Sequence, residues 1–445
     1  PVASPSPRIM NGAGDITLSN MRLVKGVGLY TSAFTVPTSA LTMTTETVLL
    51  TCNQPYMSAV GNTEQQVATG NSTVMSKIIV SSPTHDKGVV YIYDEDENGL
   101  VDPTSEIKLV APGLPQYASF GRAVTSMNSK LIVSDSKEGV YIYDLTAGTG
   151  SAADILNSQF KITPSISGTQ VYFGTGLDAD DNKIVVGAPS EGNIGAVYVY
   201  DLTAADINAS EIKITPSDGV SGNSKFGDTV YIDSNKVFVG DAKGAGSGTY
   251  TGAAYIYDLT AGDATAINAS EIKLTANDPS PVPNYLQYGN SVTYANNKLI
   301  VGCYGNGSMA PSAVYIYDLT AGDATAINAS EIKLQASDWS AQHSFGVSLH
   351  ADGNMIAVGA IGADSYVGAV YVYDLTAANI NVSEIKITPS DGVSTDDMQF
   401  GYRVSIANGK LLVGARLDDD AGFQSSGAAY IYDLTAGNAT AINAS

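Results

Sequence analysis

The chain has 445 residues, of which 44% are hydrophobic and only 15% are charged. Acidic residues outnumber lysine and arginine by 44 to 22, which gives a net charge of −22 and a pI near 4.3. This balance excludes the usual kind of nucleic-acid-binding surface, because phosphate contacts require clustered lysine and arginine. The sequence contains no run of 18 apolar residues, so no transmembrane helix is predicted.

Residues 1–45 precede the repetitive part of the chain, and we interpret them as an N-terminal extension or linker. They begin at Pro1 and lack the charged and apolar regions of a signal peptide. The chain is therefore expected to be either a processed protein or a piece of a longer one. Residues 46–445 are predicted to form a single closed domain.

A phrase close to Tyr-Ile-Tyr-Asp occurs seven times, and successive copies begin 50 to 60 residues apart. The copies begin at Tyr91, Tyr141, Tyr198, Tyr255, Tyr315, Tyr371 and Tyr430. Repeats of about this length that carry several short strands are typical of β-propellers. We therefore predict an all-β fold, a seven-bladed β-propeller of four-stranded antiparallel blades.

Residues 345–389 illustrate one repeat. Alternating apolar and polar residues at 345–350 and a short apolar run at 355–360 predict two strands, which are separated by a turn signal. Further strands are predicted at 369–375 and 384–389. The connections between them are rich in Gly, Asp and Asn, which favour turns. Four strands per repeat is the number that a propeller blade needs.

The repeated aromatic residues are predicted to be core residues rather than a ligand platform. Tyr371 and Tyr373 share one face of their strand, and neighbouring blades cover both faces, so their hydroxyl groups will need partners. A Phe-Gly pair also recurs in each repeat, where Phe would pack between blades and Gly would allow close approach. The pairs are Phe120-Gly121, Phe173-Gly174, Phe226-Gly227, Phe345-Gly346 and Phe400-Gly401, with Tyr288-Gly289 as a variant.

The ring is expected to close with a strand from the N-terminal side. The last repeat stops at Ser445, where earlier repeats continue into a fourth strand. Residues 46–51 are similar to those fourth strands, so we predict that they complete the seventh blade beside residues 430–434. Closure of this kind removes an open edge strand, which is an aggregation hazard. The alternative is that the real chain continues beyond Ser445.

The repeats resemble FG-GAP repeats, which form the seven-bladed propellers of integrin α subunits and of many microbial surface proteins. The Phe-Gly pairs and the Val-Gly-Ala segments at 186–188, 358–360 and 413–415 carry this resemblance, which covers about residues 50–445. The fuller phrase Gly-Ala-Val-Tyr-Val-Tyr-Asp-Leu is more narrowly similar to repeat proteins of marine phages, notably cyanophages. Those proteins are fibre, appendage or decoration proteins of the virion.

Residues 16–53 resemble the closing strands of laminin-G/concanavalin-like domains in the same phage proteins. This resemblance implies that residues 1–45 are the remnant of such a domain. It also offers a competing role for residues 46–51, for which we favour ring closure.

One acidic loop has the composition of a calcium site. It follows the pattern D-x-D-x-N-G-x-x-D, in which alternating carboxylates converge on one cation and the glycine permits a sharp turn. We therefore predict bound Ca²⁺ as a cofactor, and the alternative is a solvated acidic loop. The predicted ligands are Asp94, Asp96, Asn98, Leu100 and Asp102, with Leu100 contributing its carbonyl oxygen.

The usual calcium positions of FG-GAP repeats are poorly matched. The resemblance places those sites in the first hairpin of each repeat, where this chain has short turns. Only Asp178, Asp180 and Asn182 keep part of the family spacing, and residues 418–420 form a weaker acidic cluster.

The repeated unit contains no recognisable catalytic motif. It has no G-x-S-x-G elbow, phosphate-binding loop or dinucleotide fingerprint, and the three histidines lie in unrelated contexts. We therefore predict that the protein is not an enzyme. Its function is expected to reside in variable loops held by a rigid ring, namely 244–252, 278–288, 305–312 and 391–399.

Three functions remain open at this stage. The first is a virion surface or appendage protein, a fibre or decoration protein that mediates adhesion or protein–protein contacts through its loops. The second is a bacterial cell-surface or secreted adhesin, stiffened by calcium and similar to integrins. The third is a structural filament subunit whose loops meet neighbouring copies.

These functions imply a location on the virion surface or outside the cell. The expected partners are other virion or surface proteins and a host receptor or glycan. Nucleic acid and membrane insertion are not expected, and an oligomer remains open.

Overall fold

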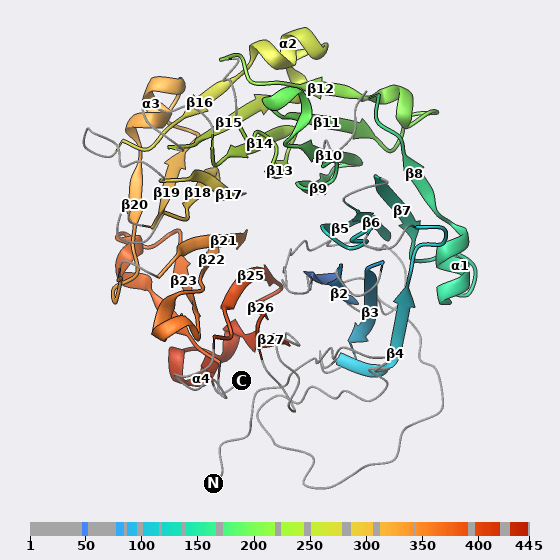
Figure 1. Ribbon diagram of the computed structural model, residues 1–445. Coiled ribbons are helices and arrows are strands. Elements are labelled where there is room, and N and C mark those ends of the chain that lie inside the picture. The colour runs from blue at the N-terminus through green and yellow to red at the C-terminus, as the bar shows by residue number, and fades with distance from the viewer. Residues whose placement is uncertain are drawn as a thin grey trace, which may run out of the picture.

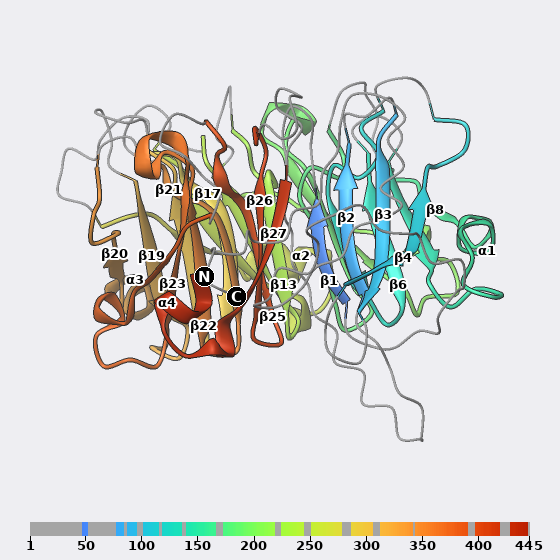
Figure 2. The same ribbon diagram turned by 90° about the horizontal axis from the view of Figure 1, so that it is seen from below.

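The computed structural model describes residues 47–51, 77–83, 87–95, 101–114, 118–135, 139–165, 172–218, 224–243, 251–277, 286–305, 312–340, 343–389, 397–418 and 428–443. The strands form seven sheets around a central axis, as Figure 1 shows in a view along that axis. Figure 2 shows the ring from the side, with the strands running roughly along the axis. The chain is a seven-bladed β-propeller, as predicted.

Each blade contains consecutive strands, and the first strand of the blade lies innermost. Blade 1 contains β1 (Thr47–Thr51), β2 (Lys77–Ser82), β3 (Val89–Glu95) and β4 (Val101–Leu109). Blade 2 contains β5 (Val124–Met127), β6 (Lys130–Ser134), β7 (Val140–Asp144) and β8 (Phe160–Ile162). Blade 3 contains β9 (Leu177–Asp180), β10 (Lys183–Ala188), β11 (Ala196–Asp201) and β12 (Ile212–Ile214).

The remaining blades follow the same plan. Blade 4 contains β13 (Thr229–Asp233), β14 (Lys236–Asp241), β15 (Ala253–Asp258) and β16 (Ile272–Leu274). Blade 5 contains β17 (Tyr288–Ala295), β18 (Lys298–Cys303), β19 (Ala313–Asp318) and β20 (Ile332–Leu334). Blade 6 contains β21 (Phe345–Asp352), β22 (Met355–Ala360), β23 (Ala369–Asp374) and β24 (Ile385–Ile387), and blade 7 contains β25 (Phe400–Ala407), β26 (Lys410–Ala415) and β27 (Ala428–Asp433).

The helices are short and lie in the connections. The α-helices are α1 (Ala152–Asn157), α2 (Ala264–Ala269), α3 (Ala324–Ala329) and α4 (Ala439–Asn443). The 3-10 turns are η1 (Glu191–Asn193), η2 (Asn208–Ser210), η3 (Leu259–Ala261), η4 (Ala363–Tyr366), η5 (Ile380–Ser383) and η6 (Leu434–Ala436). Within the described residues, none of these helices is long and apolar enough to span a membrane.

The N-terminal strand joins the ring, but the position predicted for it is wrong. Strand β1 pairs in parallel with β2, from Thr47 opposite Lys77 to Thr51 opposite Ser81, and does not pair with β27. It takes the innermost place of blade 1, between β25 and β5. A strand in this place completes the wall of the central channel, whereas a strand beside β27 would only extend the outer rim. Residues 1–46, including the predicted extension and most of the laminin-G-like segment, lie outside the described residues.

Blade 7 has three strands in the described part of the chain, with β27 outermost. Helix α4 follows β27 and occupies the place that α2 and α3 have in blades 4 and 5. The amide oxygen of Asn443 accepts a hydrogen bond from the backbone of Thr388 at 3.0 Å, just as Asn268 does from Thr215 at 2.9 Å. Blade 7 therefore contacts blade 6 in the same way as the complete blades contact one another.

In blades 2–5 and 7 the first hairpin turns through two residues with left-handed backbone angles, and in blade 6 Gly353 has such an angle. In blade 7 the two residues are Asn408 and Gly409, with φ of 50° and 72°. In blades 4 and 5 they are Ser234-Asn235 and Asn296-Asn297. Asn and Gly adopt such angles at low cost, which is why they mark these turns.

The aromatic residues of blades 2–7 form one buried cluster per blade, as predicted for the repeat. The ring of Phe226 packs edge-on against Tyr255 and Tyr257, with centroid distances of 5.1 and 6.1 Å. The same arrangement recurs at Phe120, Phe173, Phe345 and Phe400, and Tyr288 takes the place of Phe in blade 5. Edge-to-face contacts add stability beyond the burial of area alone.

The buried tyrosine hydroxyls have partners that also join neighbouring blades. The hydroxyl of Tyr257 donates to Glu271 at 2.7 Å, and the same carboxylate accepts from the backbone and side chain of Ser217 in blade 3. Equivalent bonds link Tyr373, Glu384 and Ser337 between blades 5 and 6. The glutamate that begins the outermost strand thus connects its own blade to the preceding one.

Two glycines meet at the inner joint between blades. One belongs to the Phe-Gly pair, and the other, here the VG glycine, follows Val near the end of the second strand. A Cβ placed on the VG glycine Gly240 would lie 2.1 Å from the carbonyl oxygen of Gly289 in the next blade, which is too close unless the joint shifts. Equivalent contacts involve Gly187 with Gly227 and Gly359 with Gly401.

A hydroxyl group binds the same carbonyl at most joints. The donors are Ser81, Ser134, Thr229, Ser291 and Ser348, and the acceptors are the Phe-Gly or Tyr-Gly glycines of the next blades. In blade 2 the VG glycine itself is replaced by Ser134, and its partner on the innermost strand is Ala123. Blade 2 therefore has a hydroxyl on the second strand and alanine on the innermost strand, whereas blades 4 to 6 have glycine on the second strand and a hydroxyl on the innermost strand.

We expect Gly240→Ser to lower the free energy of unfolding by about 2–4 kcal/mol, because the new Cβ would clash with Gly289 and with Oγ1 of Thr229. Adding Thr229→Ala reproduces the Ser134–Ala123 pair of blade 2 and should recover most of the loss. Urea denaturation of both variants tests this. A double variant no more stable than Gly240→Ser would contradict the proposed packing.

Candidate functional site

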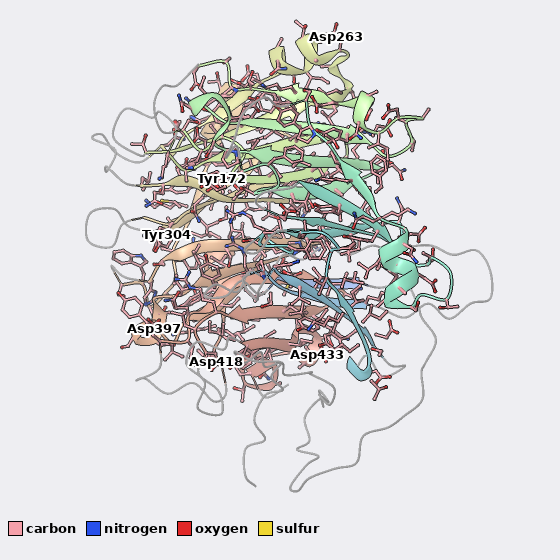
Figure 3. All side chains as sticks on the ribbon, turned by 45° about the vertical axis from the view of Figure 1, so that its right-hand side comes forward. Tyr172, Asp263, Tyr304, Asp397, Asp418 and Asp433 are labelled. Atoms are coloured by element: carbon pink, nitrogen blue, oxygen red, sulfur yellow. The ribbon has the colours of Figure 1, made fainter. Side chains whose placement is uncertain are left out.

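The topology gives the ring two faces. Each innermost strand from blade 2 to blade 7 begins at or just after its Phe-Gly or Tyr-Gly pair and ends at the hairpin turn. All these pairs therefore lie on one face, here called the FG face, and the turns lie on the other, here called the hairpin face. Connections from second to third strands and from blade to blade also lie on the FG face. In Figure 3, Tyr304, Asp397 and Asp418 of the FG face lie to the left of Asp433, which belongs to the hairpin face.

The two faces differ in how much their sequences vary. On the hairpin face, the 13 residues at 258–270 are repeated without change at 318–330 and with one substitution at 433–445. On the FG face, the connections from second to third strands differ in sequence from blade to blade. The predicted functional loops 244–252, 278–288, 305–312 and 391–399 all belong to this face, although most of their residues lie outside the described ones.

The residue that follows each Phe-Gly or Tyr-Gly pair is the variable member of an otherwise constant motif. From blade 2 to blade 7 these residues are Arg122, Thr175, Asp228, Asn290, Val347 and Tyr402. All six line one cavity of about 420 Å³ where the central channel opens on the FG face. The cavity is further lined by Thr229, Gln287, Tyr304, Ile361, Arg403 and Arg416.

Three arginines stand on one side of this cavity. Arg122 comes from blade 2, and Arg403 and Arg416 come from blade 7, on either side of blade 1. The guanidinium carbon of Arg416 lies 4.2 Å from the ring centre of Tyr402, and that of Arg403 lies 5.1 Å from it. Sequence reasoning missed these arginines. The changing residue after a constant Phe-Gly pair is a signal for Arg122 alone, because Arg403 and Arg416 do not directly follow such a pair.

Asp228 of blade 4 also lines this cavity. Burial raises the pKa of its carboxyl group, and the positive charges of Lys225, Arg122 and Arg403 act in the opposite direction. No ion pair within 4 Å joins Asp228 to Arg122 or Arg403 in the described part of the chain. The FG-face mouth thus contains more positive than negative charge, in contrast to the chain as a whole.

A ring of polar side chains lines the middle of the channel, each two residues before the end of its innermost strand. They are Thr125, Asp178, Tyr231, Thr293, His350 and Ser405. Oδ2 of Asp178 accepts a hydrogen bond from the backbone of Ile232 at 2.9 Å, and Nδ1 of His350 accepts one from Ile406 at 3.1 Å. Both bonds join one innermost strand to the next, so these side chains hold the channel wall together.

The hairpin-face mouth is acidic. A cavity of about 440 Å³ is lined by Asp180, Asp233 and Asp352, among other residues. Burial, with the neighbouring Asp233 charge adding to it, raises the pKa of Asp180, whose Oδ2 accepts a hydrogen bond from the backbone of Ser234 at 2.9 Å. Oδ2 of Asp352 likewise accepts from the backbone of Asn408 at 3.2 Å, so Asp180 and Asp352 cap the hairpin turns of the next blades.

The predicted calcium loop is described only at its two ends. Asp94 and Asp102 lie opposite each other on β3 and β4. Nζ of Lys77 lies 2.7 Å from Oδ1 of Asp94, and both side chains are buried, so a lysine already neutralises this carboxylate. Asp96, Asn98 and Leu100 lie outside the described residues. Within the described residues, no group of three or more His, Cys, Asp or Glu side chains could hold a metal ion.

Asp102 differs from Asp94 in its environment. Its Oδ1 accepts hydrogen bonds from the backbone and hydroxyl of Thr104 at 2.8 and 2.7 Å, while its Oδ2 is buried without a hydrogen-bond partner. A buried carboxylate oxygen without a partner is costly unless a cation or water neutralises it. Asp102 therefore fits a cation ligand better than Asp94 does.

Other residues singled out in the sequence have structural roles. Asp418 is 2% exposed and accepts a hydrogen bond from the hydroxyl of Tyr430 at 2.7 Å, while residues 419 and 420 lie outside the described ones. Nδ2 of Asn128 donates to Oδ1 of Asn182 at 3.0 Å, which joins the hairpin turns of blades 2 and 3. Cys303 is buried, and its Sγ donates a hydrogen bond to the carbonyl of Leu286 at 2.8 Å.

The Phe-Gly pairs, the VG glycines and the four-stranded repeat together define the unit of this ring. Residues 329–373 and 382–432 match the family model of the FG-GAP repeat. These segments cover blade 6 and most of blade 7. No curated protein matches the chain. A seven-bladed ring in which these segments match the FG-GAP repeat indicates a role in protein–protein interaction or adhesion.

The carboxyl group of Asp178 makes stability depend on pH. Burial raises its pKa from 3.8 to about 7, so its stabilising effect is complete below pH 4 and is lost as the pH rises through 7. We expect Asp178→Asn to match the wild type near pH 4 and to be more stable by roughly 2–4 kcal/mol at pH 8. Urea denaturation at both pH values measures this.

The control is Asp263→Asn, which removes the same charge from an exposed N-cap on the hairpin face. It should show no gain in stability between pH 4 and pH 8. If Asp178→Asn also showed none, the carboxyl group of Asp178 would not be the group that titrates.

Proposed function

We propose that this protein is a non-enzymatic recognition protein that binds its partner through the FG face of a rigid propeller. The observation that carries this proposal is the contrast between constant joints and a variable face. The same glycines, hydroxyls and tyrosine–glutamate pairs recur from blade to blade, so the ring is held in one geometry. The residues that change are those that face solvent or the channel mouth on the FG face.

Exposed aromatic side chains support the same face. Tyr172, Trp339 and Tyr366 are 42%, 37% and 43% exposed. Tyr172 and Trp339 lie in connections between blades, and Tyr366 lies between β22 and β23, so all three belong to the FG face. Tyrosine and tryptophan are enriched among residues that dominate binding energy at protein interfaces.

The finer assignment is a virion surface or appendage protein, either a fibre or a decoration protein. It rests on the similarity of the repeat phrase to marine phage proteins and on an acidic, closed fold without exposed sheet faces. The corresponding location is the virion surface or the extracellular space. Its partners would be other virion or surface proteins, or a host receptor or glycan.

The test is adsorption of the labelled protein to a panel of marine bacterial cells and to a printed array of glycans and surface proteins. We expect a triple variant, Tyr172→Ala, Trp339→Ala and Tyr366→Ala, to lower adsorption about tenfold or more, because truncated aromatic anchors cost about 2 kcal/mol or more. The matched control is Val382→Ala, which removes an exposed apolar side chain from the hairpin face. Equal loss in both variants, or no adsorption to any target, would contradict recognition through the FG face.

Calcium binding is the second part of the proposal, and it would favour the calcium-stiffened adhesin. Asp102 supplies the supporting observation, because its buried Oδ2 has no hydrogen-bond partner. Asp96, Asn98 and the carbonyl of Leu100 would complete the ligand set, and Asp94 would join it only by leaving Lys77. When bound, the ion would neutralise the carboxylates and hold β3 and β4 at a fixed separation.

We expect added Ca²⁺ to raise the melting temperature of the metal-free protein and EDTA to reverse the change. Asp102→Asn should abolish the shift, whereas Asp323→Asn, at the N-cap of α3, should keep it. Differential scanning calorimetry with and without about 1 mM Ca²⁺ measures the melting temperatures of the wild type and of both variants. The same shift in Asp102→Asn as in the wild type would remove this loop as the calcium site.

A further inference from the structure

The arginines of this chain are concentrated at one place. The sequence has five arginines, at positions 8, 22, 122, 403 and 416. The three that lie within the described residues all line the cavity at the FG-face mouth of the channel. In a chain with a net charge of −22, this placement creates a local positive site surrounded by an acidic surface.

Two of these arginines, Arg122 and Arg403, form no ion pair with a carboxylate of the described residues. The buried Nε of Arg122 has no hydrogen-bond partner there. Among the described residues, the Arg403 side chain donates one hydrogen bond, from Nη1 to the carbonyl of Tyr402 at 3.2 Å. A buried guanidinium N–H without a partner is costly, so this arrangement favours an incoming acceptor.

The aromatic ring of Tyr402 holds two of the guanidinium groups in position. Arg416 lies 4.2 Å and Arg403 lies 5.1 Å from its ring centre, and Nε of Arg416 donates a hydrogen bond to Gln399. Stacking of this kind reduces the side-chain freedom of arginine and leaves its edge N–H groups available for planar acceptors. The positive side of the cavity is therefore formed by groups that need little further ordering on binding.

The other side of the cavity is mainly polar, with Val347 and Ile361 adding apolar surface. Thr175, Asn290 and Gln287 contribute hydroxyl and amide groups, and Asp228 adds an acceptor. Oγ1 of Thr175 donates to the carbonyl of Tyr172 and Nδ2 of Asn290 to that of Val347, which leaves the acceptor sites of both side chains for a ligand. The volume of about 420 Å³ is within the usual range of small-molecule sites, about 300–1,000 Å³. Such a lining suits a hydroxyl-rich molecule that carries a negative group on one side.

We propose that the FG-face mouth of the channel binds an oxyanionic sugar, with its negative group held by Arg122, Arg403 and Arg416. The guanidinium groups bind the oxyanion through charge-assisted hydrogen bonds, and the amides and hydroxyls opposite bind the sugar hydroxyls. The oxyanion is either the carboxylate of a uronic acid or the sulfate of a sulfated sugar, since both present oxygens that match the guanidinium fork. This site goes beyond the proposed adhesion, because it lies at the axis and its ligand is small.

Isothermal titration calorimetry with glucuronate, glucose 6-sulfate and glucose tests the proposal. We expect at least one of the two charged sugars to bind and glucose to bind at least about tenfold more weakly, because it lacks the charged group. The tighter of the two charged sugars identifies the oxyanion as carboxylate or sulfate. Affinity should also fall as the salt concentration rises.

The variants are Arg122→Gln and Arg403→Gln, each of which should weaken binding of the charged sugar by about tenfold or more. The control is Lys108→Gln, which removes the same charge from the exposed outermost strand of blade 1 and should bind like the wild type. Circular dichroism and melting curves show whether each variant is folded.

Three results would overturn the proposal. They are no binding of either charged sugar at concentrations up to about 10 mM, binding of glucose as tight as that of the charged sugars, and unchanged affinity in both folded arginine variants. None of these measurements uses a cell surface or a protein partner. Their outcome is therefore independent of the adsorption test with Tyr172, Trp339 and Tyr366.

Discussion

The ring depends on a close contact between two backbones, which most blades make through a glycine and blades 1 and 2 make through Ser81 and Ser134. At Gly187, Gly240 and Gly359, an added Cβ would lie 1.8–2.1 Å from the carbonyl oxygen of the next blade. This contact sets the distance between the inner strands of adjacent blades. The neighbouring Phe then meets the paired tyrosines of its own blade, and the glutamate at the outer strand reaches the preceding blade. The constant motifs of the repeat are thus explained by one steric requirement and the contacts that it positions.

The same requirement leaves other positions open to change. The residue after each Phe-Gly pair lies beside the joint and lines the channel mouth, outside the contact between the glycines. Arg122, Asp228, Val347 and Tyr402 occupy equivalent positions and differ in charge, polarity and size. On the opposite face, the hairpin turns and the connections to the outer strands are tied to neighbouring blades by hydrogen bonds, and their sequences repeat. The two mouths of the channel consequently differ in charge, with arginines at one and aspartates at the other.

The repeat period and the alternation of apolar residues were sufficient to predict seven blades and, in blade 6, all four strands. In that blade the second strand begins and ends where the apolar run at 355–360 does, because Gly-Asn and Gly residues limit it on both sides. The position of β1 could not be predicted in this way. The run Thr47–Thr51 is apolar enough for either the inner or the outer place, and only its neighbours in space decide between them. The arginine cluster was also out of reach of pattern reasoning, because positions 122, 403 and 416 converge only once the ring is closed.

The parallel pairing of β1 makes the seventh joint unlike the other six. The chain passes directly from each blade to the next at six joints, so those neighbours are covalently tethered, whereas within the described residues blades 7 and 1 meet where β1 lies against β25 and β26. Separating blades 7 and 1 therefore stretches no connecting peptide. Thermal fluctuations, hydrogen exchange and unfolding under force should therefore begin where blades 7 and 1 meet. The remaining blades would then separate one after another from that point.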